Sequence, residues 1–131
     1  MSAAPRALRL LQLDAAAGGS AGLVFALAHA PIRAWTGHAA GVYAAITAAN
    51  LFYAAGGALL LATARRRGHL PRAGVAALIA ANTAWAVVCI TLVVATGERL
   101  RPLGWAHLLG EAAIVAGLAA AEAKWVWPAA R

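Results

Sequence analysis

The stretch Ala73-GVAALIAANTAWAVVCITLVVA-Thr96 contains 24 residues and no charged side chain. An α-helix rises 1.5 Å per residue, so about 20 apolar residues cross a hydrocarbon core of roughly 30 Å. Alanine-rich sequence without period-two alternation favours a helix, and an open sheet in lipid would leave its edge groups unpaired. We therefore expect this stretch to form a transmembrane helix.

Three further apolar segments, of the same kind, lie on either side of it, at residues 8–30, 38–64 and 104–127. Pro31 closes the first segment, a basic loop from Arg65 to Arg72 follows the second, and a short polar connection with Pro102 precedes the last. Short connections make neighbouring helices antiparallel. The sequence thus predicts an all-α polytopic membrane protein: one domain over residues 1–131, with helices at 8–30, 38–64, 73–96 and 104–127 in an up-down bundle.

The composition excludes an ordinary soluble domain. The 131 residues are 63% hydrophobic and 11% charged, whereas soluble domains carry about 25% charged residues. A formal net charge of +7 in a soluble chain would suggest nucleic acid. Here the arginines lie between apolar segments, so we expect no nucleic-acid partner, and we expect the run from Arg65 to Arg67 to contact anionic membrane lipids.

The distribution of basic residues predicts the orientation. Three basic residues fall on one side of the membrane: Arg33, Arg99 and Arg101. Eight fall on the other: Arg6, Arg9, Arg65, Arg66, Arg67, Arg72, Lys124 and Arg131. The positive-inside rule places the larger group in the cytoplasm. We expect a bacterial inner-membrane protein with both termini cytoplasmic, and Asp14 inside the first segment argues against a cleaved signal peptide.

Each predicted helix carries a polar residue within its apolar run: Asp14, Asn50, Asn82 and Glu111. A charged side chain at the bilayer centre costs about 2.5–3.5 kcal/mol, so such residues normally face the protein interior and find a partner there. We expect one central network, with both asparagines at mid-depth between the two acids. Asp14 is expected to pair with Lys124 or to accept hydrogen bonds from an asparagine or Gln12 at similar depth, and Glu122 is expected beside Lys124 at the interface.

Helical periodicity suggests candidate site residues. His107 and Glu111 are four residues apart on one helix face, as an acid–base pair would require; the alternative is an interfacial histidine and a structural glutamate. The catalytic candidates are Glu111, Asp14 and His107. The candidates for ligand binding are Asn50, Asn82, Trp85 and Tyr53.

We predict no metal or other cofactor. His29, His38 and His107 are expected near the outer surface, but their spacing matches no known ligand motif. The lone cysteine, Cys89, lies in apolar sequence and is expected to be buried and unreactive.

Two small-xxx-small patterns, Gly18–Gly22 and Gly37–Gly41, allow close approach of helices. They predict tight packing within one chain or, as the alternative, a homodimer.

Two stretches carry a resemblance to known proteins. Leu11-QLDAAA-Gly18 with Gly22, together with Asn82-TA-Trp85, resemble uncharacterised bacterial four-helix integral membrane proteins. The resemblance covers most of the chain and implies the same fold, without an activity to transfer. The Asn82–Trp85 and His107–Glu111 pairs also resemble, more distantly, the sterol-isomerase (emopamil-binding) type of membrane enzyme, although their order along the chain differs and the helices are fewer.

Three functions fit this pattern of residues. The first is binding of a lipophilic small molecule in a polar-lined intramembrane pocket, with acid–base chemistry at the acids. The second is a small dimeric proton-coupled transporter, and the third is a non-catalytic subunit or assembly factor of a larger membrane complex. The sequence alone leaves all three open.

Overall fold

The computed structural model describes residues 3–131, which form helices and short connections without a strand. Its long helices are α1 (Ala3–Leu27), α3 (Ala40–Arg67), α4 (Arg72–Thr96) and α5 (Pro102–Ala121). The shorter elements are α2 (His29–Thr36), η1 (Gly97–Arg99), η2 (Glu122–Val126) and η3 (Trp127–Ala129). Four segments of 23 to 28 residues are long and apolar enough to cross a membrane. The predicted all-α four-helix bundle is confirmed.

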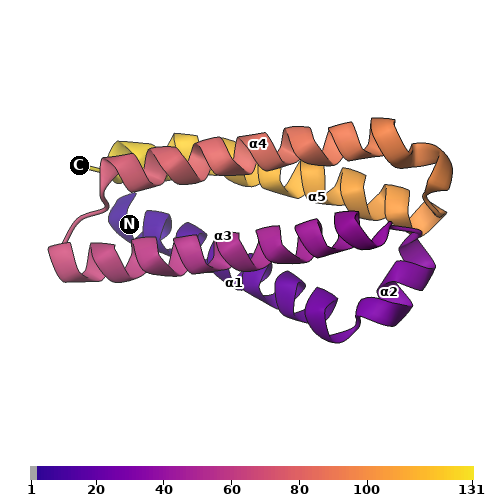
Figure 1. Ribbon diagram of the computed structural model, residues 1–131. Coiled ribbons are helices and arrows are strands. Elements are labelled where there is room, and N and C mark those ends of the chain that lie inside the picture. Colours follow the sequence, from indigo (N-terminus) through magenta and orange to yellow (C-terminus); the bar gives the residue numbers. More distant parts are fainter. Residues whose placement is uncertain (1–2) are drawn as a thin grey trace.

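The long helices run up and down, with the two termini at one end of the bundle (Figure 1). The 68–71 loop lies at that same end, and α2 and the 97–101 connection lie at the other. The backbone N–H of Arg131 donates to the carbonyl of Leu70 over 2.9 Å, and that of Arg72 donates to Arg131 over 3.1 Å. The end of the chain is therefore tied to the α3–α4 loop.

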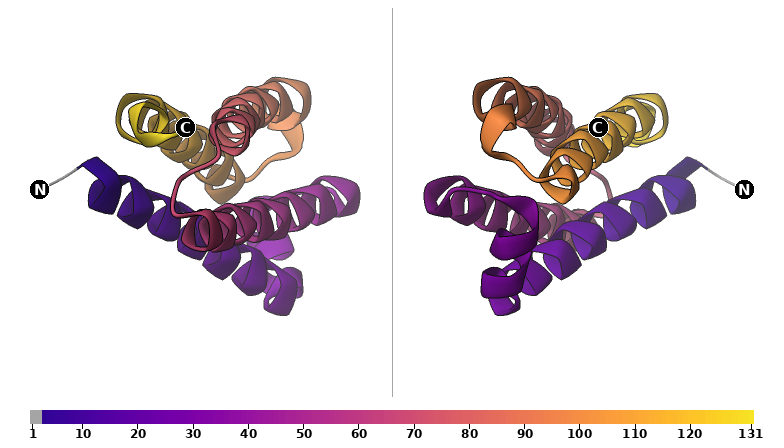
Figure 2. Two further views of the ribbon diagram at one scale, coloured as in Figure 1. Left: turned by 90° about the vertical axis from the view of Figure 1, so that its left-hand side faces the viewer. Right: turned by 90° about the vertical axis from the view of Figure 1, so that its right-hand side faces the viewer.

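The bundle consists of two helix pairs, α1 with α3 and α4 with α5, which form two layers (Figure 2). Within each pair the helices pack along their length, while α3 and α4 touch only briefly. Helix α1 contacts the second layer chiefly through η2, the segment that continues α5. The two layers are consequently joined at their ends and less closely in the middle.

Two apolar clusters hold the layers together. The cluster near the termini is built around Leu11, Val75 and Val126, and the cluster in the other half around Ile46 and Leu108; all five side chains are fully buried. Lipid tails are as apolar as leucine, so close van der Waals packing rather than the hydrophobic effect stabilises such contacts. Cys89 belongs to the second cluster and is fully buried, as predicted.

The predicted end of the first helix is wrong. The helix ends at Leu27 rather than Ala30, and α2 follows after a break at Ala28. Pro31 does not close a helix; it lies in the first turn of α2, where its missing N–H would have no intrahelical partner. Gly37 then ends α2 with φ +77°, a left-handed conformation that favours glycine.

The Gly18–Gly22 pattern packs within the chain. A Cβ at Gly18 would lie 3.2 Å from the carbonyl oxygen of Asn50, and one at Gly22 would lie 2.7 Å from Leu51. These glycines let α1 approach the backbone of α3 closely. Gly41 has open space around it, so the second pattern does not bring helices together in the same way.

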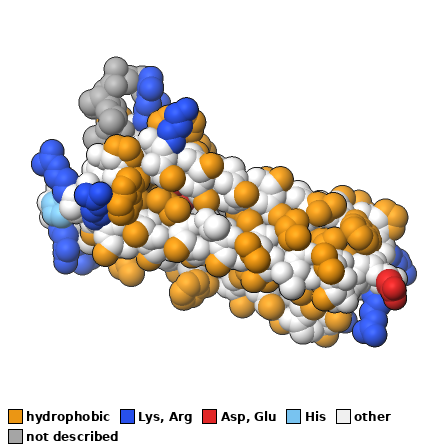
Figure 3. Space-filling model, turned by 90° about the horizontal axis from the view of Figure 1, so that it is seen from above, with side chains coloured by type: hydrophobic (Ala, Val, Ile, Leu, Met, Phe, Trp, Pro, Cys, Tyr) orange, Lys and Arg blue, Asp and Glu red, His pale blue; other side chains and the backbone are white. Residues whose placement is uncertain are grey.

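The surface matches a membrane-spanning bundle. Lys and Arg side chains gather at the two ends, and hydrophobic side chains cover the length between them (Figure 3). Large apolar residues such as Leu27, Phe52 and Val94 are more than three-quarters exposed. Trp35, Trp105 and Trp125 are half-exposed near helix ends, where aromatic belts lie.

Gly104→Ala should destabilise the bundle. A Cβ at this position would collide with the carbonyl oxygen of Thr36, which also accepts a hydrogen bond from the Arg101 backbone N–H over 3.0 Å. Overpacking of this kind costs about 1–3 kcal/mol, which thermal unfolding in detergent would measure. The control is Gly117→Ala on the same helix, where no atom lies within 4 Å of the added carbon. Equal melting temperatures for the two variants would contradict this packing of α5 against α2.

Candidate functional site

The space between the two layers holds a cavity of about 430 Å³. Its apolar walls include Phe25 on α1 and Val115 and Leu118 on α5, and its small residues include Gly18 and Gly110. Ala17 on α1 and Ile114 on α5 also line it and are themselves exposed on the bundle surface. The cavity therefore opens sideways between α1 and α5, on a surface that faces lipid in a membrane-spanning protein.

Polar side chains from all four long helices line this one cavity. They are the seven residues named above as catalytic and ligand-binding candidates: Asp14, Asn50, Tyr53, Asn82, Trp85, His107 and Glu111. No Lys or Arg is among the lining residues. The structure thus brings together every candidate that helical periodicity turned inward.

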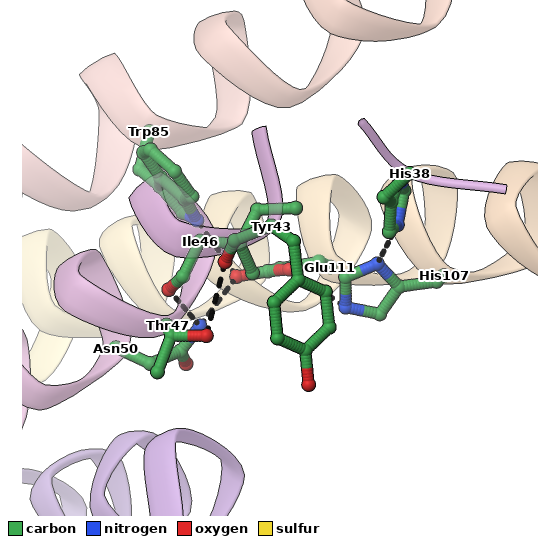
Figure 4. A network of polar contacts seen from close by, with 8 residues as sticks. All are labelled: His38, Tyr43, Ile46, Thr47, Asn50, Trp85, His107 and Glu111. Carbon is green, nitrogen blue, oxygen red and sulfur yellow. Dashed lines mark hydrogen bonds and ion pairs between the residues drawn. The ribbon is translucent and has the colours of Figure 1, made fainter. Parts of the chain in front are cut away.

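Glu111 is the centre of the first polar cluster (Figure 4). Its Oε1 accepts hydrogen bonds from Trp85 Nε1 over 2.7 Å and from Asn50 Nδ2 over 3.1 Å. Its Oε2 lies 3.1 Å from Nε2 of His107, the distance of an ion pair or a bent hydrogen bond. Oε2 is buried, and no donor reaches it in regular hydrogen-bond geometry.

His38 extends this cluster toward the end of the bundle. The residue lies between α2 and α3 and is 3% exposed, and its Nε2 is 3.2 Å from Nδ1 of His107. Burial holds the pKa of His38 below its ordinary value; His107 adds to this effect and Glu111 opposes it. The sequence placed His38 only among interfacial histidines, because nothing in its spacing shows that its ring meets that of His107.

A second cluster joins α1, α4 and η2. Asn82 Nδ2 donates to Oε2 of Glu122 over 3.0 Å, and the Asp14 carboxyl lies beside both side chains. Glu122 is fully buried, Asn82 is 2% exposed and Asp14 is 9% exposed. Of the partners predicted for Asp14, an asparagine is found, Asn82, while Glu122 takes the place of Lys124 and Gln12. One asparagine serves each acid cluster, so the single central network that was predicted is also wrong.

The predicted pairing of Glu122 with Lys124 is wrong, and Glu122 is fully buried. Glu122–Val126 forms a π-helix, whose turns hold more residues than α-turns. Trp125 in this turn is 49% exposed. Lys124 points its ammonium over the Trp125 ring at 5.2 Å instead of pairing with Glu122. A regular helical projection from the sequence has no signal for this turn.

Two further observations bear on the candidates. The Tyr53 hydroxyl donates to the carbonyl of Ala81 over 2.8 Å, so this residue offers the cavity its ring rather than a free hydroxyl. Among residues 3–131, no three His, Cys, Asp or Glu side chains are grouped so that they could hold a metal ion.

Comparison of the chain with protein-family models, with characterised proteins and with solved structures finds no match.

Asn82→Ala should destabilise the protein more than an exposed substitution beside it. It removes the donor to Glu122 and leaves a buried carboxyl oxygen without its partner. Side-chain hydrogen bonds between membrane helices contribute about 0.6–2 kcal/mol, so thermal unfolding in detergent should show a loss of about 1–2 kcal/mol. The control is Thr83→Ala, whose hydroxyl is exposed and bonds only within α4. If both variants unfold alike, the Asn82–Glu122 bond does not stabilise the fold.

Proposed function

We propose that this protein binds a lipophilic small molecule in the cavity between α1 and α5, with Asp14, His107 and Glu111 available to exchange protons with it. The observation that carries the proposal is the convergence of seven polar side chains on one mainly apolar cavity that opens sideways. A pocket with apolar walls and a few convergent polar groups is the usual form of a small-molecule site.

The size and opening of the cavity support a lipophilic ligand. Its volume of about 430 Å³ lies within the roughly 300–1,000 Å³ of small-molecule pockets. Because Ala17 and Ile114 line it at the surface of the bundle, a molecule dissolved in the bilayer reaches it without crossing water. Trp85 and Tyr53, whose rings lie 6.4 Å apart, supply flat apolar surface on the inner wall.

The polar groups define where the ligand would be recognised. Glu111 is held by Trp85 and Asn50 through Oε1, which fixes its orientation, while Oε2 faces His107. A fixed carboxylate next to an imidazole is a pair that can act as general acid or base toward a ligand proton within hydrogen-bond reach. Asp14 adds a second carboxyl that lines the same cavity.

A proton-coupled transporter is the second candidate. It is favoured by one observation: Glu111 with its histidines and Asp14 with Glu122 form separate acid clusters beside one cavity. A transporter needs such groups to exchange protons with both sides of the membrane. As a third possibility, the chain serves as a non-catalytic subunit or assembly factor of a larger membrane complex.

We further propose a bacterial inner membrane with both termini in the cytoplasm. This rests on the excess of basic residues at the end of the bundle that holds the termini and the 68–71 loop.

Native mass spectrometry of the protein purified in a gentle detergent should show a retained small molecule other than a lipid. Gly110→Leu should abolish its retention, because Gly110 lines the cavity and nothing lies within 4 Å of an added Cβ, so the leucine fills the space. The control is Gly117→Leu, which also adds a leucine to an open position of α5 but does not line the cavity.

Other outcomes separate the three functions. A bare dimer favours the transporter, and a co-purifying larger protein favours the subunit. A small molecule that both variants retain equally binds elsewhere, and the cavity is then not the site.

Impermeant maleimide should label the 97–101 connection but not the 68–71 loop from outside intact cells. The test compares Glu98→Cys with His69→Cys, both exposed positions, in a Cys89→Ser background. Labelling of the His69→Cys protein alone would reverse the proposed orientation.

A further inference from the structure

The histidines at the edge of the Glu111 cluster form a continuous row. His38 Nε2 lies 3.2 Å from His107 Nδ1, and His107 Nε2 lies 3.1 Å from Glu111 Oε2 (Figure 4). His38 belongs to the 37–39 connection at the end of the bundle, whereas Glu111 lines the cavity. Three proton-carrying groups thus lead from the end of the bundle that holds α2 into the proposed site.

The hydrogen-bond chemistry gives this row a direction. A neutral imidazole has one N–H and one lone pair. Oε1 of Glu111 already accepts two bonds, and Nε2 of His107 lies 3.1 Å from Oε2, so a proton on Nε2 lies next to Oε2 in a bent arrangement. Nδ1 of His107 is then an acceptor, and the proton between the two rings belongs to Nε2 of His38. Nδ1 of His38 is left with a lone pair that has no partner among residues 3–131.

We propose that His38 and His107 are a proton relay between the end of the bundle and Glu111. A proton from water forms an N–H bond at Nδ1 of His38, and the Nε2–H bond of His38 breaks as that proton passes to Nδ1 of His107. The Nε2 proton of His107 then passes to Oε2 of Glu111. Each ring gains one proton and gives one up, so the step balances, and it runs equally in reverse.

Apolar and hydrogen-bonded side chains surround the row formed by His38, His107 and Glu111. The Phe25 ring lies 4.9 Å from the His107 ring and covers it with apolar surface. Tyr43 of α3 donates its hydroxyl to the carbonyl of Phe25, and Arg33 of α2 exerts its charge on Tyr43. Nδ1 of His38 is buried, and the next residue, Ala39, is exposed, so the relay requires water to enter past the 37–39 connection to reach Nδ1.

The connectivity of the relay rests on these distances alone, while its use in supplying Glu111 with protons for a ligand rests on the proposed function. The test therefore measures the proton positions without any ligand. ¹⁵N-histidine-labelled protein, in lipid nanodiscs and without a polyhistidine tag, gives imidazole ¹⁵N shifts that report which nitrogen is protonated. Single His38→Gln and His107→Gln variants assign the signals.

At pH 8 both rings should carry their single proton on Nε2. When a proton enters the row, it should appear at Nδ1 of His107 while the proton of His38 moves from Nε2 to Nδ1, and the two changes should occur together. His38 protonated on Nδ1 at pH 8, or two independent midpoints, would overturn the relay.

Glu111→Gln provides the second measurement. The Glu111 charge opposes the lowering of the His38 pKa, so loss of the carboxylate should lower the midpoint at which the His38 proton moves. The signal of His69, exposed at the opposite end of the bundle, is the internal control and should not move. An unchanged midpoint would show that the row does not reach Glu111. If the two histidines change together but no small molecule is retained, the relay is supported and the proposed pocket is refuted. If a small molecule is retained but the histidines change independently, the relay alone is refuted.

Discussion

A carboxyl group inside a bilayer has to find its hydrogen-bond donors on its own chain, and this requirement governs how the four long helices meet. Glu111 on α5 takes donors from α3 and α4. Glu122 takes one from α4, and the pair lies against Asp14 of α1. Apolar contacts alone fix membrane helices weakly in rotation, because one apolar face packs much like another. The two acid clusters therefore select the register in which the layers join.

The same arrangement produces the cavity. Glycines let α1 close tightly on α3, and η2 holds α1 near the other layer at one end only. The cavity lies between α1 and α5, and small residues of α1, Ala17, Gly18 and Ala21, form part of its wall. The fold therefore combines two closely packed helix pairs with a cavity between them. Most of the polar side chains that join the two pairs also line this cavity.

Much of this organisation could be predicted from the sequence. Uninterrupted apolar runs define the helices, because a bilayer admits few alternatives, and the 3.6-residue period places Asn50, Asn82 and Glu111 inside. The partners could not be predicted. A periodic pattern gives the face of one helix but not its rotation against another, so Lys124, Gln12 and an asparagine were all expected near Asp14, and Glu122 was missed. The π-helix of η2 and the separate α2 depend on local backbone winding, which composition does not encode.

The absence of Lys and Arg from the cavity wall has a consequence for competition with the surrounding lipid. A cavity open to the bilayer is bathed in acyl chains at high concentration, and any ligand must displace them. Free fatty acids and anionic headgroups would bring a negative charge beside Asp14 and Glu111, and only a protonated His107 would offset it. If the cavity holds the proposed ligand, this arrangement favours neutral or hydrogen-bond-donating molecules over acidic lipids.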